Sequence, residues 1–290
     1  MKLEGRRESD NVDDRRMGGG KKAGLGIGGL IVVGLITYFT SGGNWMDVVS
    51  SLFSSGQLSN AITQTGAGHE PTAEEQEQAK FARTILASTE DVWTKVFEQM
   101  GRKYTPPEMV LFTGSTSSGC GGASAQTGPF YCSADQKLYI DLSFFDQMKN
   151  QLGAGGDFAY AYVIAHEVGH HVQYLLGTLD KVHQQQARLN EKMSNQLSVR
   201  LELQADFYAG IWAYYENKMF NSLESGDIEK GLNAANAVGD DRLQKQAQGY
   251  TVPDAFNHGT SEQRVRWLKK GATGGNMADG DTFSPDYSAL

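Results

Sequence analysis

Apolar residues recur along the chain at spacings that predict mostly helices. Helical spacing is found in five segments: residues 79–101, 157–177, 179–219, 225–249 and 261–271. The third segment is long enough to be broken once, and the fourth predicts one or two helices. Gly101 and Gly177 are suited to end helices, and Thr260 or Ser261 is suited to begin the last one.

Two shorter segments are rich in β-branched and aromatic residues instead, which is typical of strands. They are MVLFTG at residues 109–114 and KLYIDLSFF at residues 137–145. Together with the helical segments they predict an α+β fold that is mostly helical and has a small sheet. The 290 residues suffice for one sizeable domain with appendages, and we find no internal repeat.

One segment near the N-terminus is apolar throughout. Residues 23–40, AGLGIGGLIVVGLITYFT, carry no charge, and a helix of that length spans about 27 Å, close to the hydrocarbon core of a bilayer. Arg15, Arg16, Lys21 and Lys22 precede it, and no Lys or Arg follows before residue 80. This asymmetry predicts a single-pass helix in the cell membrane, with the N-terminus cytoplasmic and the domain outside. A cleaved signal peptide is the alternative, but its apolar stretch would usually be shorter and nearer the start.

The predicted division of the chain follows from these segments. Residues 1–22 are polar and are expected to form a disordered cytoplasmic segment. Residues 41–74 are rich in Ser, Gly, Gln and Thr and are expected to be a flexible linker. The folded domain is expected at residues 75–272, followed by a polar tail at 273–290. The net charge of −8 argues against nucleic-acid binding, which usually needs a clustered basic patch.

The chain has two cysteines, Cys120 and Cys132. If the domain lies outside the cytoplasm, they meet an oxidising compartment, where a disulfide between them is expected. Two free thiols are the alternative. A zinc site made of cysteines is disfavoured, because only two are present and they form no CxxC pair.

The clearest chemical signal is HEVGHH at residues 166–171, inside the second helical segment. Positions i and i+4 share a helix face, so His166 and His170 can bind one metal ion. Glu167 then lies beside the metal without being a ligand, where a carboxylate can take a proton from metal-bound water. Because this short pattern also occurs by chance, a helix with structural histidines is the alternative.

A third ligand is available in the next helical segment, which carries LELQADFYAG. Glu202 and Asp206 are again i and i+4, and they stand among apolar neighbours where an unpaired acid is costly to bury. If this helix crosses the first, Glu202 completes a two-His, one-Glu zinc site and Asp206 orients a ligating imidazole. Ala205, Ala209 and Gly210 are small enough to permit a close crossing. A solvated acidic helix face is the alternative.

HEVGH followed by ELQAD resembles the gluzincin class of zinc metallopeptidases. Four longer segments after an apolar anchor resemble the bacterial neutral zinc metallopeptidase family, from residue 1 to about residue 285: GPFYCSADQKLYIDLSFF, HEVGHHVQ, LELQADFYAGIWA and HGTSEQRVRW. The resemblance implies a zincin-like core, one zinc ion and peptide-bond hydrolysis, but no particular substrate. By position it implies the roles already given for His166, Glu167, His170, Glu202 and Asp206. It also implies that strand 137–145 lies above the site, where it could pair with an extended substrate.

Three further histidines of the domain need assignment. His171 is turned about 100° from its neighbour on a helix, so we expect a structural or solvent-facing role. His183 lies in a polar stretch and is expected to be exposed. In gluzincins a later segment commonly supplies a donor to the developing oxyanion, which makes His258 a candidate catalytic residue and Tyr250 a weaker one. For His258 the alternative is capping of the last helix or pairing with Asp254.

These residues predict a membrane-anchored zinc metalloendopeptidase that acts on a protein or peptide, with Glu167 as general base and one zinc ion per chain. The second hypothesis is a catalytically silent, zinc-binding envelope module for interaction or assembly, although a structural metal site has no need of Glu167. The third is a zinc amidase that acts on a cell-wall peptide. The ligand set favours zinc over other metals.

Overall fold

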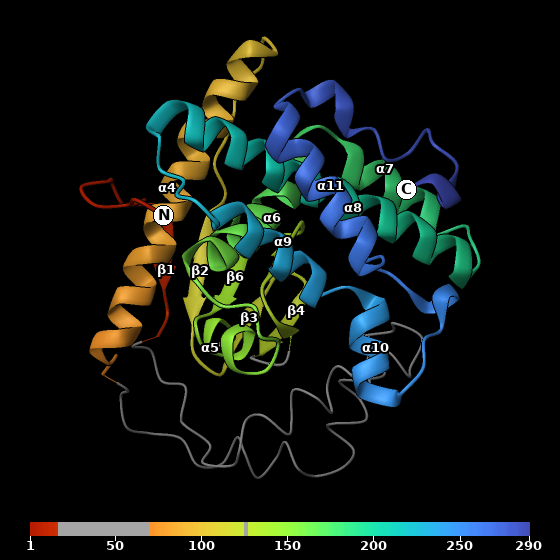
Figure 1. Ribbon diagram of the computed structural model, residues 1–290, viewed down its shortest axis with the longest axis horizontal. Coiled ribbons are helices and arrows are strands. Elements are labelled where there is room, and N and C mark those ends of the chain that lie inside the picture. Colours follow the sequence, from red (N-terminus) through yellow and green to blue (C-terminus); the bar gives the residue numbers. More distant parts are fainter. Residues whose placement is uncertain (17–69, 125–126) are drawn as a thin grey trace.

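The computed structural model describes residues 1–16, 70–124 and 127–290. A four-stranded sheet has the strand order β1-β2-β6-β5 (Figure 1). Its strands are β1 (Val12–Asp14), β2 (Glu108–Phe112), β6 (Lys137–Asp141) and β5 (Phe130–Cys132). The first three are mutually parallel, whereas β5 runs antiparallel to β6. A separate hairpin consists of β3 (Ser115–Ser118) and β4 (Gly121–Ser124).

Alternating side chains along β2 and β6 face two different hydrophobic clusters, because successive residues of a strand point to opposite sides. One face, with Met109, Leu111, Leu138 and Ile140, belongs to the main core that the helices share. The other face packs in a smaller cluster with the hairpin, through Val110, Phe112, Tyr139, Cys132 and Ala123. Both faces of the sheet are therefore covered, which explains why these two strands are apolar at nearly every position.

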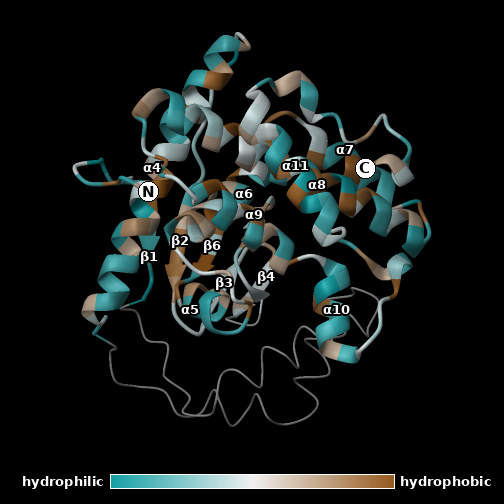
Figure 2. Ribbon diagram, viewed as in Figure 1, coloured by the Kyte–Doolittle hydropathy of each residue, from teal (hydrophilic) through white to brown (hydrophobic). Residues whose placement is uncertain are grey.

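Eight α-helices lie in the described part of the chain, and the main core lies between them and the sheet. They are α4 (Ala73–Gln99), α5 (Ser143–Asn150), α6 (Asp157–Leu175), α7 (Thr178–Gln186), α8 (Glu191–Phe220), α9 (Asp227–Ala237), α10 (Asp240–Gln248) and α11 (Ser261–Gly274). Apolar residues concentrate on β2, β6 and α6, whereas α10 is mostly hydrophilic (Figure 2). The observed class is α+β and mostly helical, as the sequence predicts.

Most predicted helix ends are confirmed by local capping contacts. Gly177 follows α6 with a φ of 76°, a conformation that glycine adopts without strain. The predicted break in the long third segment separates α7 from α8, whose N-cap is the side chain of Asn190. Thr260, rather than Ser261, caps α11 and forms a capping box with Gln263.

Two predicted boundaries are wrong. The strand expected at 137–145 ends at Asp141, and α5 begins at Ser143 because the Asp141 carboxylate accepts a hydrogen bond from the Ser143 amide. The tail at 273–290 is part of the fold rather than an appendage. Thr282 and Leu290 are buried, and Arg200 of α8 donates to the carbonyl oxygens of Thr282 and Pro285.

The N-terminal segment, residues 1–16, is also not disordered as expected. It packs beside α4 and contributes β1 to the sheet (Figure 1), because its cations find acidic partners on the helices and its backbone pairs with β2. The expected transmembrane helix at 23–40 lies outside the described residues, as do 17–22 and 41–69. Within the described ranges, no helix combines the length and apolarity needed to span a bilayer.

Candidate metal centre

Helices α6 and α8 cross closely at the site, and the crossing depends on a glycine of the HEVGHH motif. A Cβ atom on Gly169 would lie 2.9 Å from the carbonyl oxygen of Ala205, so the two backbones leave no room for a side chain there. Ala205 therefore has the role that the sequence predicts. Gly210 does not contribute to this crossing. Its missing Cβ makes room for α11, and Gly271 of α11 in turn lies against the backbone of α8.

The crossing brings together the three predicted ligands. Nε2 of His166 lies 3.2 Å from Oε2 of Glu202, and Nε2 of His170 lies 3.3 Å from Oε1 of the same carboxylate. One ligand atom from each of the three residues lies within 4.8 Å of the others. Tetrahedral zinc with bonds of about 2.0–2.1 Å places its ligand atoms about 3.3 Å apart, so the two His–Glu distances and the donor set fit this metal.

His166 is oriented from behind by a buried network. Its Nδ1–H donates to Oδ1 of Asp206 over 2.8 Å, which leaves Nε2 free to face the metal position. Asp206 is fully buried and also accepts from the Tyr162 hydroxyl at 2.6 Å and from Arg264 at 2.8 and 3.0 Å. The position that the sequence assigned to Asp206 is thus the observed one, and Arg264 compensates its buried charge.

His170 has an orienting partner of its own. Its Nδ1 lies 2.9 Å from Oε1 of Gln173, one turn further along α6. The amide nitrogen of Gln173 donates to the carbonyl oxygen of Leu201 at 2.7 Å, which fixes which end of the amide faces the imidazole. Both histidines therefore present Nε2 to the same point, because each has its Nδ1 occupied.

The charges at the site are strongly coupled. Burial alone would lower the pKa of His166, but the carboxylates of Asp206 and Glu202 outweigh it and raise the pKa to about 10. Burial would raise the pKa of Glu202, yet the imidazoles of His170 and His166 hold it well below its usual range. A metal that binds Nε2 of His166 must therefore displace a proton, so its affinity depends on pH.

The three ligands and Glu167 face a cavity of about 620 Å³. Glu167 follows the first ligand on α6, is 7% exposed and lines the cavity. Strand β5 and the residues before it form one wall, through Pro129, Phe130 and Tyr131 among others. The strand that borders the site is therefore β5, and the expectation for 137–145 is wrong, because β6 is paired on both sides with β2 and β5.

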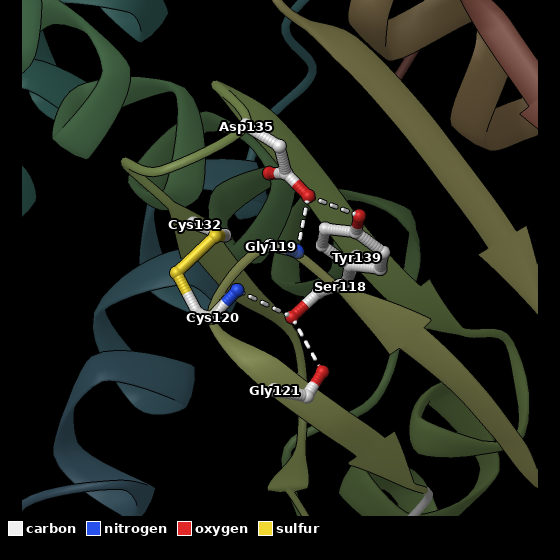
Figure 3. Close-up of a disulfide and its surroundings, with 7 residues drawn as sticks. All are labelled: Ser118, Gly119, Cys120, Gly121, Cys132, Asp135 and Tyr139. Carbon is white, nitrogen blue, oxygen red and sulfur yellow. Dashed lines mark hydrogen bonds between the residues drawn. A yellow bond between two sulfur atoms is a disulfide. The ribbon is translucent and has the colours of Figure 1, made fainter.

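A disulfide fixes this wall. Cys120 and Cys132 are bonded, as expected, and close the loop that leads from the hairpin into β5 (Figure 3). Oδ2 of Asp135 accepts both the amide of Gly119 and the hydroxyl of Tyr139, each at 2.6 Å. Because Cys120 itself lines the cavity, the bond ties the cavity wall to the end of the sheet.

His258 lines the same cavity from the segment before α11. Its Nδ1 lies 3.2 Å from Oδ1 of Asp240, and its backbone amide donates to the other oxygen of that carboxylate at 2.7 Å. The partner is therefore Asp240, the first residue of α10, and not Asp254. Tyr250 is 62% exposed and is not among the residues that line the cavity.

Of the two roles expected for His171, structural or solvent-facing, the structure shows the structural one. It is 1% exposed, and its Nε2–H donates to the carbonyl oxygen of Thr105 at 2.8 Å. Its Nδ1 lies 3.0 Å from the hydroxyl of Tyr131 on β5, so His171 connects α6 to the strand beside the cavity. His183 is exposed, as expected, and lies at the rim of the cavity.

Four residues of the site were missed at the level of sequence. Two of them could have been found from helix spacing. Gln173 lies three residues after His170 and Tyr162 lies four residues before His166, so each shares a helix face with a predicted ligand. Asp240 carries no such signal, because it stands in an ordinary polar stretch far in sequence from the site. Arg264 lies in the family segment HGTSEQRVRW, but nothing in that segment shows that its partner is Asp206, 58 residues earlier.

Comparisons with known proteins agree with this geometry. A family model described as "putative neutral zinc metallopeptidase" matches residues 1–283. The uncharacterized protein YpfJ of Escherichia coli K12 is 49% identical over 291 residues, covering 98% of this chain and 99% of that protein. The uncharacterized protein Rv2575 of Mycobacterium tuberculosis H37Rv is 41% identical over 215 residues, 71% of this chain and 72% of its own. No solved structure matches. The extent of the family match and the similarity to YpfJ show that the chain belongs to this neutral zinc metallopeptidase family.

Proposed function

We propose that the protein is a zinc-dependent peptidase whose metal ligands are His166, His170 and Glu202. One observation carries the proposal: two imidazole Nε2 atoms converge on the two oxygens of Glu202 at 3.2 and 3.3 Å, inside a cavity that Glu167 also lines. A purely structural zinc site is usually closed by four protein ligands, whereas a catalytic site keeps one position for water or substrate. Three ligands beside a cavity fit the catalytic type.

A bound zinc ion would supply Lewis acidity, lowering the pKa of water and polarising a peptide carbonyl. Glu167 is then the group that takes a proton from the attacking water and delivers it to the leaving amine. His258, held by Asp240, is the candidate donor to the oxygen that gains negative charge. The sequence gives the same roles to Glu167 and His258.

Strand β5 is the proposed substrate-binding element. It is the outermost strand on the cavity side of the four-stranded sheet, so an extended peptide can add to it through backbone hydrogen bonds. His171 and the disulfide both hold this strand in place, which supports a role that needs a fixed edge. A polypeptide is therefore the proposed substrate class.

We also propose that the metal centre lies outside the cytoplasm. The disulfide between Cys120 and Cys132 supports this location, because such bonds persist in oxidising compartments. Attachment to the membrane through residues 23–40 stays a prediction from the apolar sequence of that segment.

A silent zinc-binding module is the second candidate. Such a module would need the three ligands, but its function would not change if Glu167 were replaced. The cavity favours the peptidase, since it gives Glu167 access to a bound molecule.

The test measures zinc content and casein cleavage of the full-length protein in detergent. We expect one zinc per chain in the wild type and in Glu191→Ala, a matched change at an exposed position of the same helix. Glu202→Ala should lose most of the zinc and all cleavage. Zinc without cleavage of casein or of a random peptide library would favour the silent module, and a metal-replete wild type without zinc would refute the site.

A further inference from the structure

The N-terminal segment (residues 1–16) supplies the counter-charge for an acid in the core of the domain. Glu216 of α8 is fully buried. Its carboxylate accepts from the guanidinium of Arg6 at 2.7 Å and from the Ser88 hydroxyl, which in turn accepts from the Trp212 indole at 2.8 Å. An ionised carboxylate in such a place needs a cation, and the one that the structure provides comes from the N-terminal segment.

A second core acid is matched in the same way. Glu90 of α4 is 6% exposed. It accepts from the Ser9 hydroxyl at 2.5 Å and from the Asn11 amide at 2.7 Å, and its other oxygen lies 2.9 Å from the guanidinium of Arg7. The helices thus carry two buried acids whose cationic partners, Arg6 and Arg7, belong to the N-terminal segment, which indicates that the two parts fold as one unit.

The backbone of the segment completes the sheet. Strand β1 pairs in parallel with β2, with the Met109 amide donating to the Asn11 carbonyl at 2.9 Å and the Arg15 amide donating to the Leu111 carbonyl at 2.8 Å. Without it the amides and carbonyls of β2 would form an exposed sheet edge, which folded proteins usually cover. The segment therefore covers the edge of β2 as a permanent strand of the sheet would.

Two of the cations that suggested a cytoplasmic N-terminus are used in this packing. Arg15 lies 2.7 Å from the carboxylate of Asp13, and Arg16 is 4% exposed and lies 2.6 Å from that of Asp14. Arg83 of α4 contacts the same Asp14 at 2.7 Å. Each positive charge is thus compensated by a nearby carboxylate, with Arg16 buried and Arg15 partly exposed, and both weigh less as a signal for membrane orientation.

We propose that residues 1–16 are a permanent part of the metal-binding domain and lie in the same compartment as the metal centre. A chain that crosses a membrane once between residues 16 and 70, in either orientation, would put Arg6 and Glu216 on opposite sides. The packed segment and a single crossing exclude each other.

The first test is the labelling of single cysteines in spheroplasts of a bacterial host. The two native cysteines are bonded to each other, so Glu4→Cys or Glu229→Cys gives one free thiol, each at an exposed position for which no contact is seen. A membrane-impermeant maleimide is added before and after lysis. We expect the same ratio of labelling at both positions, whether both are accessible or both protected. Accessibility at one position and protection at the other would overturn the proposal.

The second test asks whether the segment is docked in the purified, full-length protein in detergent. Arg6→Ala should lower the melting temperature by about 5 °C or more. The control is Arg102→Ala, whose exposed side chain has no partner among the described residues, and it should leave the melting temperature unchanged. In a Glu216→Gln background Arg6→Ala should cost clearly less, because no buried charge is stranded. Equal melting temperatures for Arg6→Ala and Arg102→Ala would refute the docking.

Discussion

Two histidines at the cavity each have an aspartate behind Nδ1, yet they differ in burial and in what their other nitrogen faces. His166 is 8% exposed, and its Nε2 points at the carboxylate of Glu202 at 3.2 Å. His258 is 36% exposed and lines the cavity from the segment before α11, with Asp240 behind it at 3.2 Å. The same pair of residue types therefore serves two purposes.

The difference lies in the groups that hold each aspartate. Asp206 behind His166 is tied to Tyr162 and Arg264, which fixes the imidazole as tightly as metal binding requires. Asp240 behind His258 accepts mainly backbone amides, at residues 257, 258 and 259, and so shapes a loop. We infer that the first pair holds a metal ligand, whereas the second aims an imidazole into the cavity.

The largest effect is expected when metal binding is kept and the base is removed. In Glu167→Gln the three ligands are untouched, so zinc content should stay at the wild-type level. The turnover of casein should fall by about 10³-fold, because no group takes the proton from the attacking water. Zinc analysis and initial cleavage rates on the same sample check this, and an active variant would remove Glu167 from the mechanism.

His258→Ala should come next, with turnover lower by about 10²-fold and zinc content unchanged, since a donor to the oxyanion is lost but no ligand is. Asp240→Asn should give a smaller loss in the same direction. Measurement of kcat and KM on a defined peptide separates this from weaker substrate binding. If zinc is lost instead, His258 contributes to metal binding as His166 does, and the contrast between the two histidines is wrong.

Asp206→Asn should show the opposite pattern to Asp240→Asn. We expect metal affinity to fall by about 10–100-fold, because the amide no longer balances Arg264 or accepts fully from His166. The fully loaded variant should keep turnover within a few-fold of wild type. Competition with a zinc chelator gives the affinity, and an unchanged affinity would mean that Asp206 only stabilises the fold.

The smallest effect concerns His171, which has no carboxylate behind it. Burial lowers its pKa to about 4, although the bond to Thr105 opposes this. A histidine with a lowered folded pKa stabilises the fold above its unfolded pKa of about 6.5, and this stability is lost as the pH falls toward 4. Between pH 7 and 5 the metal-free wild type should lose about 2 kcal/mol more than His171→Gln, by urea unfolding. Equal losses would show that the pKa of His171 is not lowered in the folded protein.

Local patterns were sufficient for much of the site. The i, i+4 pairs on α6 and α8 place four side chains by helix geometry alone, and the small Ala205 permits the crossing that brings them together. The break between α7 and α8 and the cap at Thr260 follow from neighbouring residues in the same way. Such features depend on contacts within a few residues, so a single sequence contains them.

Other features depend on partners far apart in the chain. Asp240 rather than Asp254 meets His258, and Arg264 reaches Asp206, because the packing of α10 and α11 on α8 decides which charges meet. Strand β5 rather than β6 borders the cavity because strand order is set by pairing across the sheet. The sequence by itself thus determined the helices, the three candidate ligands and the glutamate beside them. Only the tertiary structure decided what orients the candidate ligands, which strand borders the cavity and that residues 1–16 pack against the domain. The reason is that buried charges and open strand edges find their partners only in the folded chain.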